Sequence, residues 1–198
     1  VLLSQTQLLH SSVEIGSISE VRGNAQVLRD KPYGAELAFN IQQMDDVRTE
    51  TGRVAITFAD SSTVKLTEHS KLVIDEYIYD PDPSKSKMAL KFASGTARFI
   101  TGKFNNKSNI SIRTPTAQIA IRGTDFTCTV DELGRSLVIL LPDENGISSG
   151  EIIVSTGMGS VTLNKPYQAT TVSVYENNPT KPVTLDISLD LSAIFDLD

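Results

Sequence analysis

The fold assignment starts from one stretch, Arg53-Val54-Ala55-Ile56-Thr57-Phe58-Ala59. Val54, Ile56 and Phe58 occupy alternate positions, and small or polar residues stand between them. Successive side chains of a β-strand point to opposite faces, so this alternation places the three apolar side chains on one face of a strand. The stretch is therefore expected to form a half-buried strand and not a helix.

The same alternation recurs along most of the chain, and turn residues separate the runs. The apolar positions are Val64/Leu66, Leu72/Ile74, Ala97/Phe99, Ile110/Ile112, Ile119/Ile121, Phe126/Cys128/Val130, Leu137/Ile139/Leu141, Ile152/Val154, Val161/Leu163 and Val172/Val174. The predicted turns are Asp60-Ser61-Ser62, Ser94-Gly95, Thr101-Gly102, Asn105-Asn106, Glu132-Leu133-Gly134, Glu144-Asn145-Gly146 and Gly157-Met158-Gly159. Short strands with frequent turns, and no helical pattern between them, are typical of sandwiches and rolls. We therefore predict an all-β fold, an antiparallel-rich β-sandwich or β-roll of many short strands with a C-terminal extension.

Three segments are predicted along the chain: an N-terminal arm over residues 1–12, a β domain over residues 13–175 and a C-terminal strand or tail over residues 176–198. In the tail, apolar residues alternate regularly with polar ones, at Leu185, Ile187, Leu189 and Leu191. Such a strand either completes the chain's own sheet or pairs with a neighbour's sheet edge as an interaction strand. The first alternative is favoured, since most strands pair within their chain.

The composition excludes several classes of protein and of site. The 198 residues carry a formal net charge of −6 and include one Cys, two His and no Trp. A single thiol rules out a disulfide within the chain, and with two histidines it also rules out a Cys/His zinc cage. Binding a phosphate backbone needs a positive field, so the net charge disfavours nucleic acid as a partner. No apolar stretch is long enough to span a membrane as a helix.

One motif matches part of a catalytic site, the G-x-S-x-G pattern at Gly146-Ile147-Ser148-Ser149-Gly150. A nucleophile elbow needs a helix after its serine, whereas strand sequence follows here and both histidines precede Ser148. Cys128 stands between apolar residues of a predicted strand, which favours a buried and inert thiol. We therefore predict no catalytic, cofactor-binding or metal site.

Two acidic stretches, Asp45-Asp46 and Asp80-Pro81-Asp82, leave an alternative open. Their carboxylates could make a weak calcium contact or form the acid pair of a glycosidase. The favoured interpretation is that Asp80 and Asp82 lie in a solvated loop and that Asp45 and Asp46 accept backbone N–H groups at a turn. A carbohydrate-active enzyme or another hydrolase is the third hypothesis for the function.

Three blocks of the sequence resemble the FecR-protein domain. The first is GSISEVRGNAQV at 16–27, and the second, over 44–72, contains MDDVRT, GRVAITFADSS, VKL and SKL. The third block, over 112–126, contains IRTPTA and IRGTDF and resembles the family's hallmark. The hallmark positions are Arg113, Thr114, Pro115, Arg122, Gly123, Thr124 and Phe126.

The hallmark residues predict a structural turn and bend. Pro115 cannot donate to a strand ladder, so it must end a strand or lie at a bend. Gly123 permits a positive φ or a close crossing of two chain segments. Arg113 and Arg122 each follow an apolar position, so both should face away from the core, where either could bridge Asp45, Asp46 or Asp125.

The resemblance implies a non-catalytic β domain without a cofactor. The first hypothesis is a protein–protein interaction or structural module that binds protein partners or copies of itself, in a larger assembly such as a phage virion. The alternative is the periplasmic sensor half of a regulator of iron uptake, in which an anti-sigma segment and a membrane helix precede the module. These hypotheses place the chain on a virion or extracellular particle, or in the bacterial periplasm and cell envelope.

Overall fold

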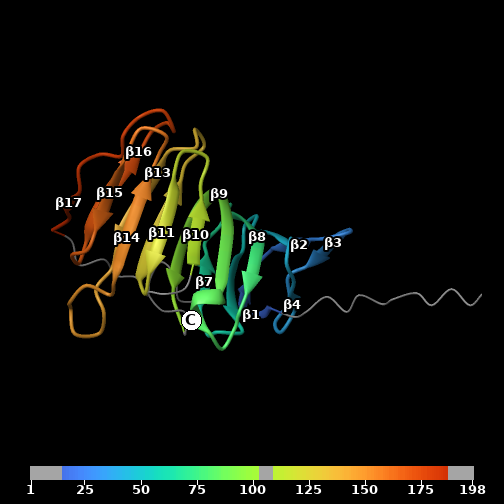
Figure 1. Ribbon diagram of the computed structural model, residues 1–198. Coiled ribbons are helices and arrows are strands. Elements are labelled where there is room, and N and C mark those ends of the chain that lie inside the picture. Colours follow the sequence, from blue (N-terminus) through green and yellow to red (C-terminus); the bar gives the residue numbers. More distant parts are fainter. Residues whose placement is uncertain (1–14, 103–108, 187–198) are drawn as a thin grey trace, which may run out of the picture.

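The computed structural model describes residues 15–102 and 109–186, and this part of the chain is almost entirely β (Figure 1). Its strands form two facing layers, which we name sheet A and sheet B. The short 3-10 helix η1 (Pro83–Lys85) lies between two strands. The prediction of an all-β fold is confirmed. No helix within the described ranges is long and apolar enough to span a membrane.

Along the chain, single strands or pairs of strands belong in turn to sheet A and to sheet B. Its order is β4 (Asn40–Ile41), β1 (Gly16–Arg22), β6 (Arg53–Phe58), β7 (Thr63–Leu66), β9 (Lys87–Ile100), β12 (Asp125–Val130), β13 (Ser136–Leu140), β16 (Gln168–Val172) and β17 (Val183–Thr184).

Sheet B shares β9 with sheet A. Its order is β3 (Pro32–Gly34), β2 (Gln26–Leu28), β5 (Asp46–Arg48), β8 (Lys71–Ile78), β9, β10 (Asn109–Arg113), β11 (Gln118–Arg122), β14 (Glu151–Ser155) and β15 (Ser160–Leu163). Every pairing in both sheets is antiparallel except that of β9 with β10, as the antiparallel-rich prediction requires.

Strand β9 passes from one sheet to the other without a break. Its first part, to Ser94, pairs with β8 and β10 in sheet B, and its second part, from Gly95, pairs with β7 and β12 in sheet A. The turn predicted at Ser94-Gly95 is therefore wrong. Gly95 has φ +96°, and a Cβ on it would overlap Ser70. The glycine bends the strand closely past Ser70, so the chain changes sheet and does not reverse.

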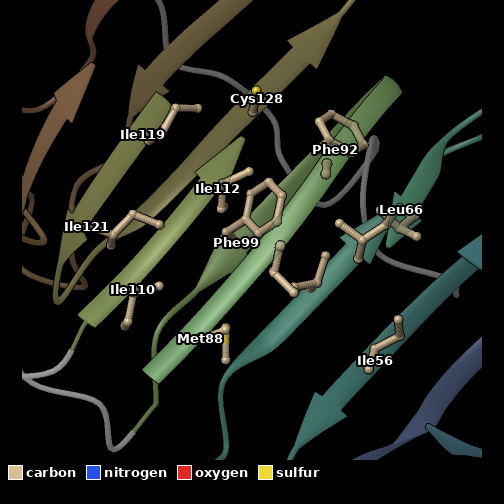
Figure 2. Packing of buried hydrophobic residues seen from close by; sticks show 14 of the residues in the cluster. Ile56, Leu66, Met88, Phe92, Phe99, Ile110, Ile112, Ile119, Ile121 and Cys128 are labelled. Carbon is tan, nitrogen blue, oxygen red and sulfur yellow. The ribbon is translucent and has the colours of Figure 1, made fainter. Parts of the chain in front are cut away.

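The core lies between the two sheets and contains most of the apolar residues predicted from the alternation (Figure 2). The predicted inward set Leu137/Ile139/Leu141 is wrong: Val138 and Leu140 face the core, whereas Ile139 and Leu141 form a separate cluster with Ala169. Phe92 and Phe99, both on β9, pack edge to face with ring centroids 6.0 Å apart, and Phe99 stacks on Phe126 of β12 at 5.1 Å. Aromatic pairs at these spacings add to the stabilisation from burial. Because β9 supplies two of the three rings, the shared strand also forms the centre of the core.

The C-terminal strands differ from the sequence prediction in one respect. β16 ends at Val172, and Val174 lies beyond it with 43% of its surface exposed, so the strand predicted through Val174 is shorter than expected. Farther on, β17 pairs with β16, and the N–H of Leu185 donates to the carbonyl of Tyr167 at 2.9 Å. The start of the tail therefore pairs within its own chain. Ile187, Leu189 and Leu191 lie outside the described residues.

Candidate functional site

The first part of the hallmark forms the turn between β10 and β11. The N–H of Thr114 donates to the carbonyl of Ala117 at 2.9 Å, and the Thr114 hydroxyl accepts from the N–H groups of Thr116 and Ala117. Pro115 lies exposed at the tip, where no ladder donor is needed. The predicted role of Pro115 in ending a strand agrees with this position.

Buried hydroxyl groups join this turn to sheet A. Ser136 is the first residue of β13 in sheet A. Its hydroxyl lies 2.7 Å from the Thr114 hydroxyl and 2.8 Å from the Thr116 hydroxyl. The Thr116 hydroxyl also lies 3.0 Å from the carbonyl oxygen of Gly134 and 3.2 Å from that of Val172. Buried polar groups are stable only when hydrogen-bonded, so this cluster fixes the end of a sheet B hairpin against sheet A.

The second part of the hallmark carries the chain from sheet B to sheet A. Gly123 has φ +56°, the left-handed region that glycine adopts readily. The carbonyl oxygen of Gly123 lies so close to Gly150 that a Cβ on Gly150 would overlap it. Thr124 is buried and donates its N–H to the Thr101 hydroxyl at 2.7 Å. The bend predicted at Gly123 thus lies where one segment crosses another.

A two-fold hydrogen-bonded ion pair follows this crossing. The guanidinium of Arg98 donates to the two carboxylate oxygens of Asp125 at 2.9 and 2.7 Å. Arg98 is on β9 and Asp125 is on the neighbouring strand β12, and both side chains lie on the outer face of sheet A. This geometry, with two parallel N–H···O bonds, is the strongest and most directional arrangement of these groups.

An open hollow of about 770 Å³ lies beside this ion pair. The end of β9 forms one wall of the hollow, and the loop from Pro142 to Ser149 forms another. Arg98, Gly123 and Asp125 also line it. The Thr124 Oγ1 at this hollow is buried and finds no hydrogen-bond partner among the described residues. The hollow is open to solvent, its lining is as apolar as it is polar, and the arginine in its wall is paired with Asp125.

The two hallmark arginines face solvent on the outer face of sheet B, as predicted. Arg113 is exposed, and Arg122 lies 3.3 Å from Glu151, its direct neighbour on β14. The carboxylates proposed as arginine partners bind other residues: Asp45 binds Arg29 at 2.7 Å, Asp46 binds Arg48 at 2.8 Å and Asp125 binds Arg98. Those expected bridges are wrong, because the register places Glu151 next to Arg122 and the crossing carries Asp125 to the opposite face.

The outer face of sheet B is open to solvent around these arginines. One row across the strands contains small or uncharged side chains in register: Ala89, Ser111, Ala120, Ile153 and Thr162. Ser111 and Ala120 at its centre are exposed. A row of this kind offers a macromolecule a surface without charged side chains.

The favoured interpretation of the acidic stretches agrees with the bonding of Asp45, Asp80 and Asp82 but not with that of Asp46, which binds the side chains of Arg48 and Lys71. Asp45 is fully buried and accepts from the N–H of Gln42 at 2.8 Å, in addition to the Arg29 guanidinium. Asp80 and Asp82 accept backbone N–H groups in the loop around η1. Over residues 15–102 and 109–186, no group of three or more His, Cys, Asp or Glu side chains lies close enough to hold a metal ion.

The two groups considered for nucleophilic chemistry are held in structural positions. The Ser148 hydroxyl donates to the carbonyl of Gly150 at 2.7 Å, within the loop that leads into β14. Cys128 is fully buried, and burial raises the pKa of its thiol to about 12. A thiol that keeps its proton at neutral pH is a poor nucleophile, which agrees with the prediction of an inert cysteine.

One buried polar cluster was not predicted from the sequence. Asp60, in the turn after β6, accepts from the Tyr77 hydroxyl of β8 at 2.9 Å and also from the hydroxyl of Ser62. Burial and the Asp60 charge together raise the pKa of the Tyr77 phenol above its ordinary value. The cluster joins the two sheets at the end opposite the β10–β11 turn. Its sequence signal was a Tyr at an inward position of a strand, since a buried phenol needs an acceptor.

Comparisons with known proteins agree with this architecture. The family described as FecR protein matches residues 45–143, which include β5 to β13 and the whole hallmark. Two crystal structures of a protein of Parabacteroides distasonis ATCC 8503, assigned provisionally as an anti-sigma factor, are also similar. Each shares 15% identity with the chain, with a TM-score of 0.55 over 71% of it. The chain spans 60% of the length of that protein, and at this identity the likeness shows the fold. No curated protein matches the chain.

Proposed function

The chain belongs to the FecR protein family, and from this premise we propose that its β domain is the sensor module of a signal-transduction regulator. The module acts by binding a protein partner and not by catalysis. We assign residues 13–175 to this domain and residues 176–198 to a separate tail. This is the alternative in which the chain is the periplasmic half of a regulator.

The observation that carries this proposal is the likeness to the Parabacteroides protein over most of the chain. An anti-sigma factor acts by binding another protein, so a β domain of this fold within one has a part in signalling. The family match over 45–143 is independent support for the same class. The alternative of a module in an assembly such as a phage virion stays a prediction, because neither structural neighbour is described as a virion protein.

The internal geometry also supports a binding role over a catalytic one. The polar groups of the hallmark are used in holding the fold: the Thr116 hydroxyl joins the sheets, and Asp125 is paired with Arg98. The side chains that remain for a partner lie on exposed faces, and the uncharged row through Ser111 and Ala120 is on one of them. Function in such a module depends on surface shape, which a single bulky charge can change.

A complementation experiment tests the proposal in the source organism. The gene is deleted, and transcripts are compared before and after return of the wild-type gene, of Ala120→Arg and of Leu133→Arg. Leu133 is 75% exposed in the turn between β12 and β13 and serves as the matched control. We expect deletion to change a defined group of transcripts, and wild type and Leu133→Arg to restore them. Unchanged transcripts in the deletion strain would exclude a signalling role.

The Ala120→Arg variant tests where the partner binds. We expect it to be folded, since the arginine points into solvent, but to fail to restore the transcripts. Full restoration by this variant would move the partner surface away from the outer face of sheet B without removing the signalling function.

A further inference from the structure

Strands β9 and β10 run side by side in sheet B and then separate. Their pairing ends at Lys91 and Arg113. Beyond this point Gly95 bends β9 into sheet A, and Pro115 has no N–H group with which to continue the ladder from β10. We call the place where the two strands separate, directly after Lys91 and Arg113, the β9–β10 fork.

An open hollow of about 200 Å³ lies at the β9–β10 fork, and its lining is almost entirely apolar. It is lined by Lys91, Phe92 and Ala93 of β9 and by Arg113, Thr114 and Pro115 at the end of β10. Pockets that hold whole small molecules measure about 300–1,000 Å³. This hollow is smaller, so it suits a single side chain that a larger partner inserts.

Ala93 is the residue of the hollow that an incoming chain can reach. It is exposed, and it is the extra residue of a β-bulge, because Phe92 and Ser94 pair with successive residues of β8. On its other side, the register with β10 has already ended at Lys91. The extra residue of a bulge is left out of the ladder, and bulges are frequent next to functional sites. The hollow therefore contains an exposed residue without a cross-strand neighbour in the described part of the chain.

The rim of the hollow contains a cation without a counterion. Lys91 and Arg113 lie opposite each other in the register, and both are exposed. Lys91 is paired with Asp75 of β8 at 3.0 Å, whereas Arg113 has no hydrogen-bond or ion-pair partner among the described residues. The neighbour of Arg113 on β11 is Gln118, which is uncharged. Like charges on adjacent strands repel each other, so this position favours an incoming carboxylate.

The two features of the hollow have different parts in binding. A guanidinium binds a carboxylate through two parallel hydrogen bonds, as Arg98 binds Asp125 in this molecule. An exposed ion pair alone contributes little free energy, because water competes for both groups. Burial of an apolar side chain in the hollow would therefore supply most of the affinity, and Arg113 would select which side chains are presented next to it.

We propose that the hollow at the β9–β10 fork anchors the protein partner, which inserts an apolar side chain there and binds Arg113 with an adjacent Asp or Glu. This inference rests on the proposed function, because it names the chemistry of the partner that this function requires. Arg113 follows Ser111 by two residues on β10, and Ala120 is opposite Ser111 on β11. The hollow and the uncharged row are thus parts of one outer face.

Peptide selection on the immobilised full-length protein tests the chemistry of the partner. The probe is a displayed library of random linear peptides. We expect the enriched peptides to share an aromatic or large aliphatic residue next to Asp or Glu. Enriched peptides without a carboxylate, or no enrichment at all, would overturn the proposal.

Three variants then locate the bound peptide by its dissociation constant. Arg113→Glu should weaken binding of a synthetic enriched peptide about tenfold, because it removes the charged donor, and Ala93→Trp should weaken it about tenfold by filling the hollow. Lys165→Glu is the matched control, since Lys165 is an exposed cation in the loop between β15 and β16, and it should change binding by less than about twofold. Circular dichroism of each variant shows whether it is folded. Equal losses with Arg113→Glu and Lys165→Glu would overturn the proposal.

Two further outcomes separate this inference from others. A dimer of the free protein that Arg113→Glu dissociates, measured by light scattering, would show that a second copy occupies the hollow and would overturn the proposal. The peptide experiments use purified protein, so they can fail while deletion of the gene still changes transcripts. Unchanged transcripts with intact peptide binding would exclude the signalling role and retain the anchor.

Discussion

Replacement of Gly123 isolates the conformational requirement of the sheet-to-sheet crossing. Gly123 has φ +56°, and no atom lies within 4 Å of a Cβ built on it, so a larger residue meets strain but no overlap. An L-residue in the left-handed region costs about 1–2 kcal/mol, and a β-branched one costs more. The loss of chain entropy in the unfolded state offsets about 0.4–1 kcal/mol. We therefore expect Gly123→Val to lower the free energy of unfolding by about 2 kcal/mol and Gly123→Asn, which tolerates this region, by less than about 1 kcal/mol.

Urea unfolding followed by circular dichroism measures this difference. With a denaturant slope of about 2 kcal/mol per molar, Gly123→Val should lower the midpoint by about 1 M and leave the slope unchanged. Gly34→Val is the matched control, because Gly34 has open space around a Cβ and no positive φ, and valine favours a strand. A Gly123→Val midpoint equal to that of wild type, or a Gly123→Asn variant as unstable as Gly123→Val, would refute the conformational argument.

Three further predictions concern buried polar groups. Thr116→Val should lower the free energy of unfolding by about 1–3 kcal/mol in the same assay, because it removes the hydroxyl that binds two backbone carbonyls. Thr162→Val, at an exposed threonine, should change the free energy of unfolding by less than about 0.5 kcal/mol. Arg29→Met should lower the free energy of unfolding by about 3 kcal/mol, since it leaves the fully buried Asp45 carboxylate without its cation. Arg48→Met, at a half-exposed arginine, should lower it by less than about 1 kcal/mol. Equal effects of the two substitutions would contradict the argument from burial. Because the pKa of Cys128 rises from 9.0 to about 12 on folding, the folded state holds this proton more tightly, and stability should fall by up to about 1.4 kcal/mol per pH unit as pH rises above 9.0. Cys128→Ala should make the loss of stability with rising pH shallower. An unchanged slope would count against a role of the Cys128 thiol in this pH dependence.

Features that depend on a few neighbouring residues were predictable from the sequence. The alternation of Val54, Ile56 and Phe58 places all three side chains in the core, because the period of a strand is a local property. The bend at Gly123 was predicted for the same reason, since the backbone preference of glycine does not depend on the rest of the fold. The outward direction of Arg122 followed from its apolar neighbour Ile121.

Features that depend on which strands become neighbours were not predictable. The partners of Asp45 and Asp125 are Arg29 and Arg98, which strand pairing brings beside them, and the register of that pairing cannot be read from the sequence. The pair Ser94-Gly95 has the composition of a turn, but the position of Ser70 close to Gly95 turns it into a bend within one long strand. In both cases a residue distant in the sequence decides between local conformations of similar energy.

The positions of the hallmark residues separate stability from recognition in this fold. Thr114, Thr124 and Phe126 are buried, and Gly123 turns the chain where it crosses from sheet B to sheet A. A substitution at these positions therefore acts first on the joint between the sheets and lowers stability whatever the partner is. Differences in partner choice between proteins of this fold must then arise on exposed surfaces. In this chain the outer face of sheet B around Ala120 is the surface that we propose receives the partner.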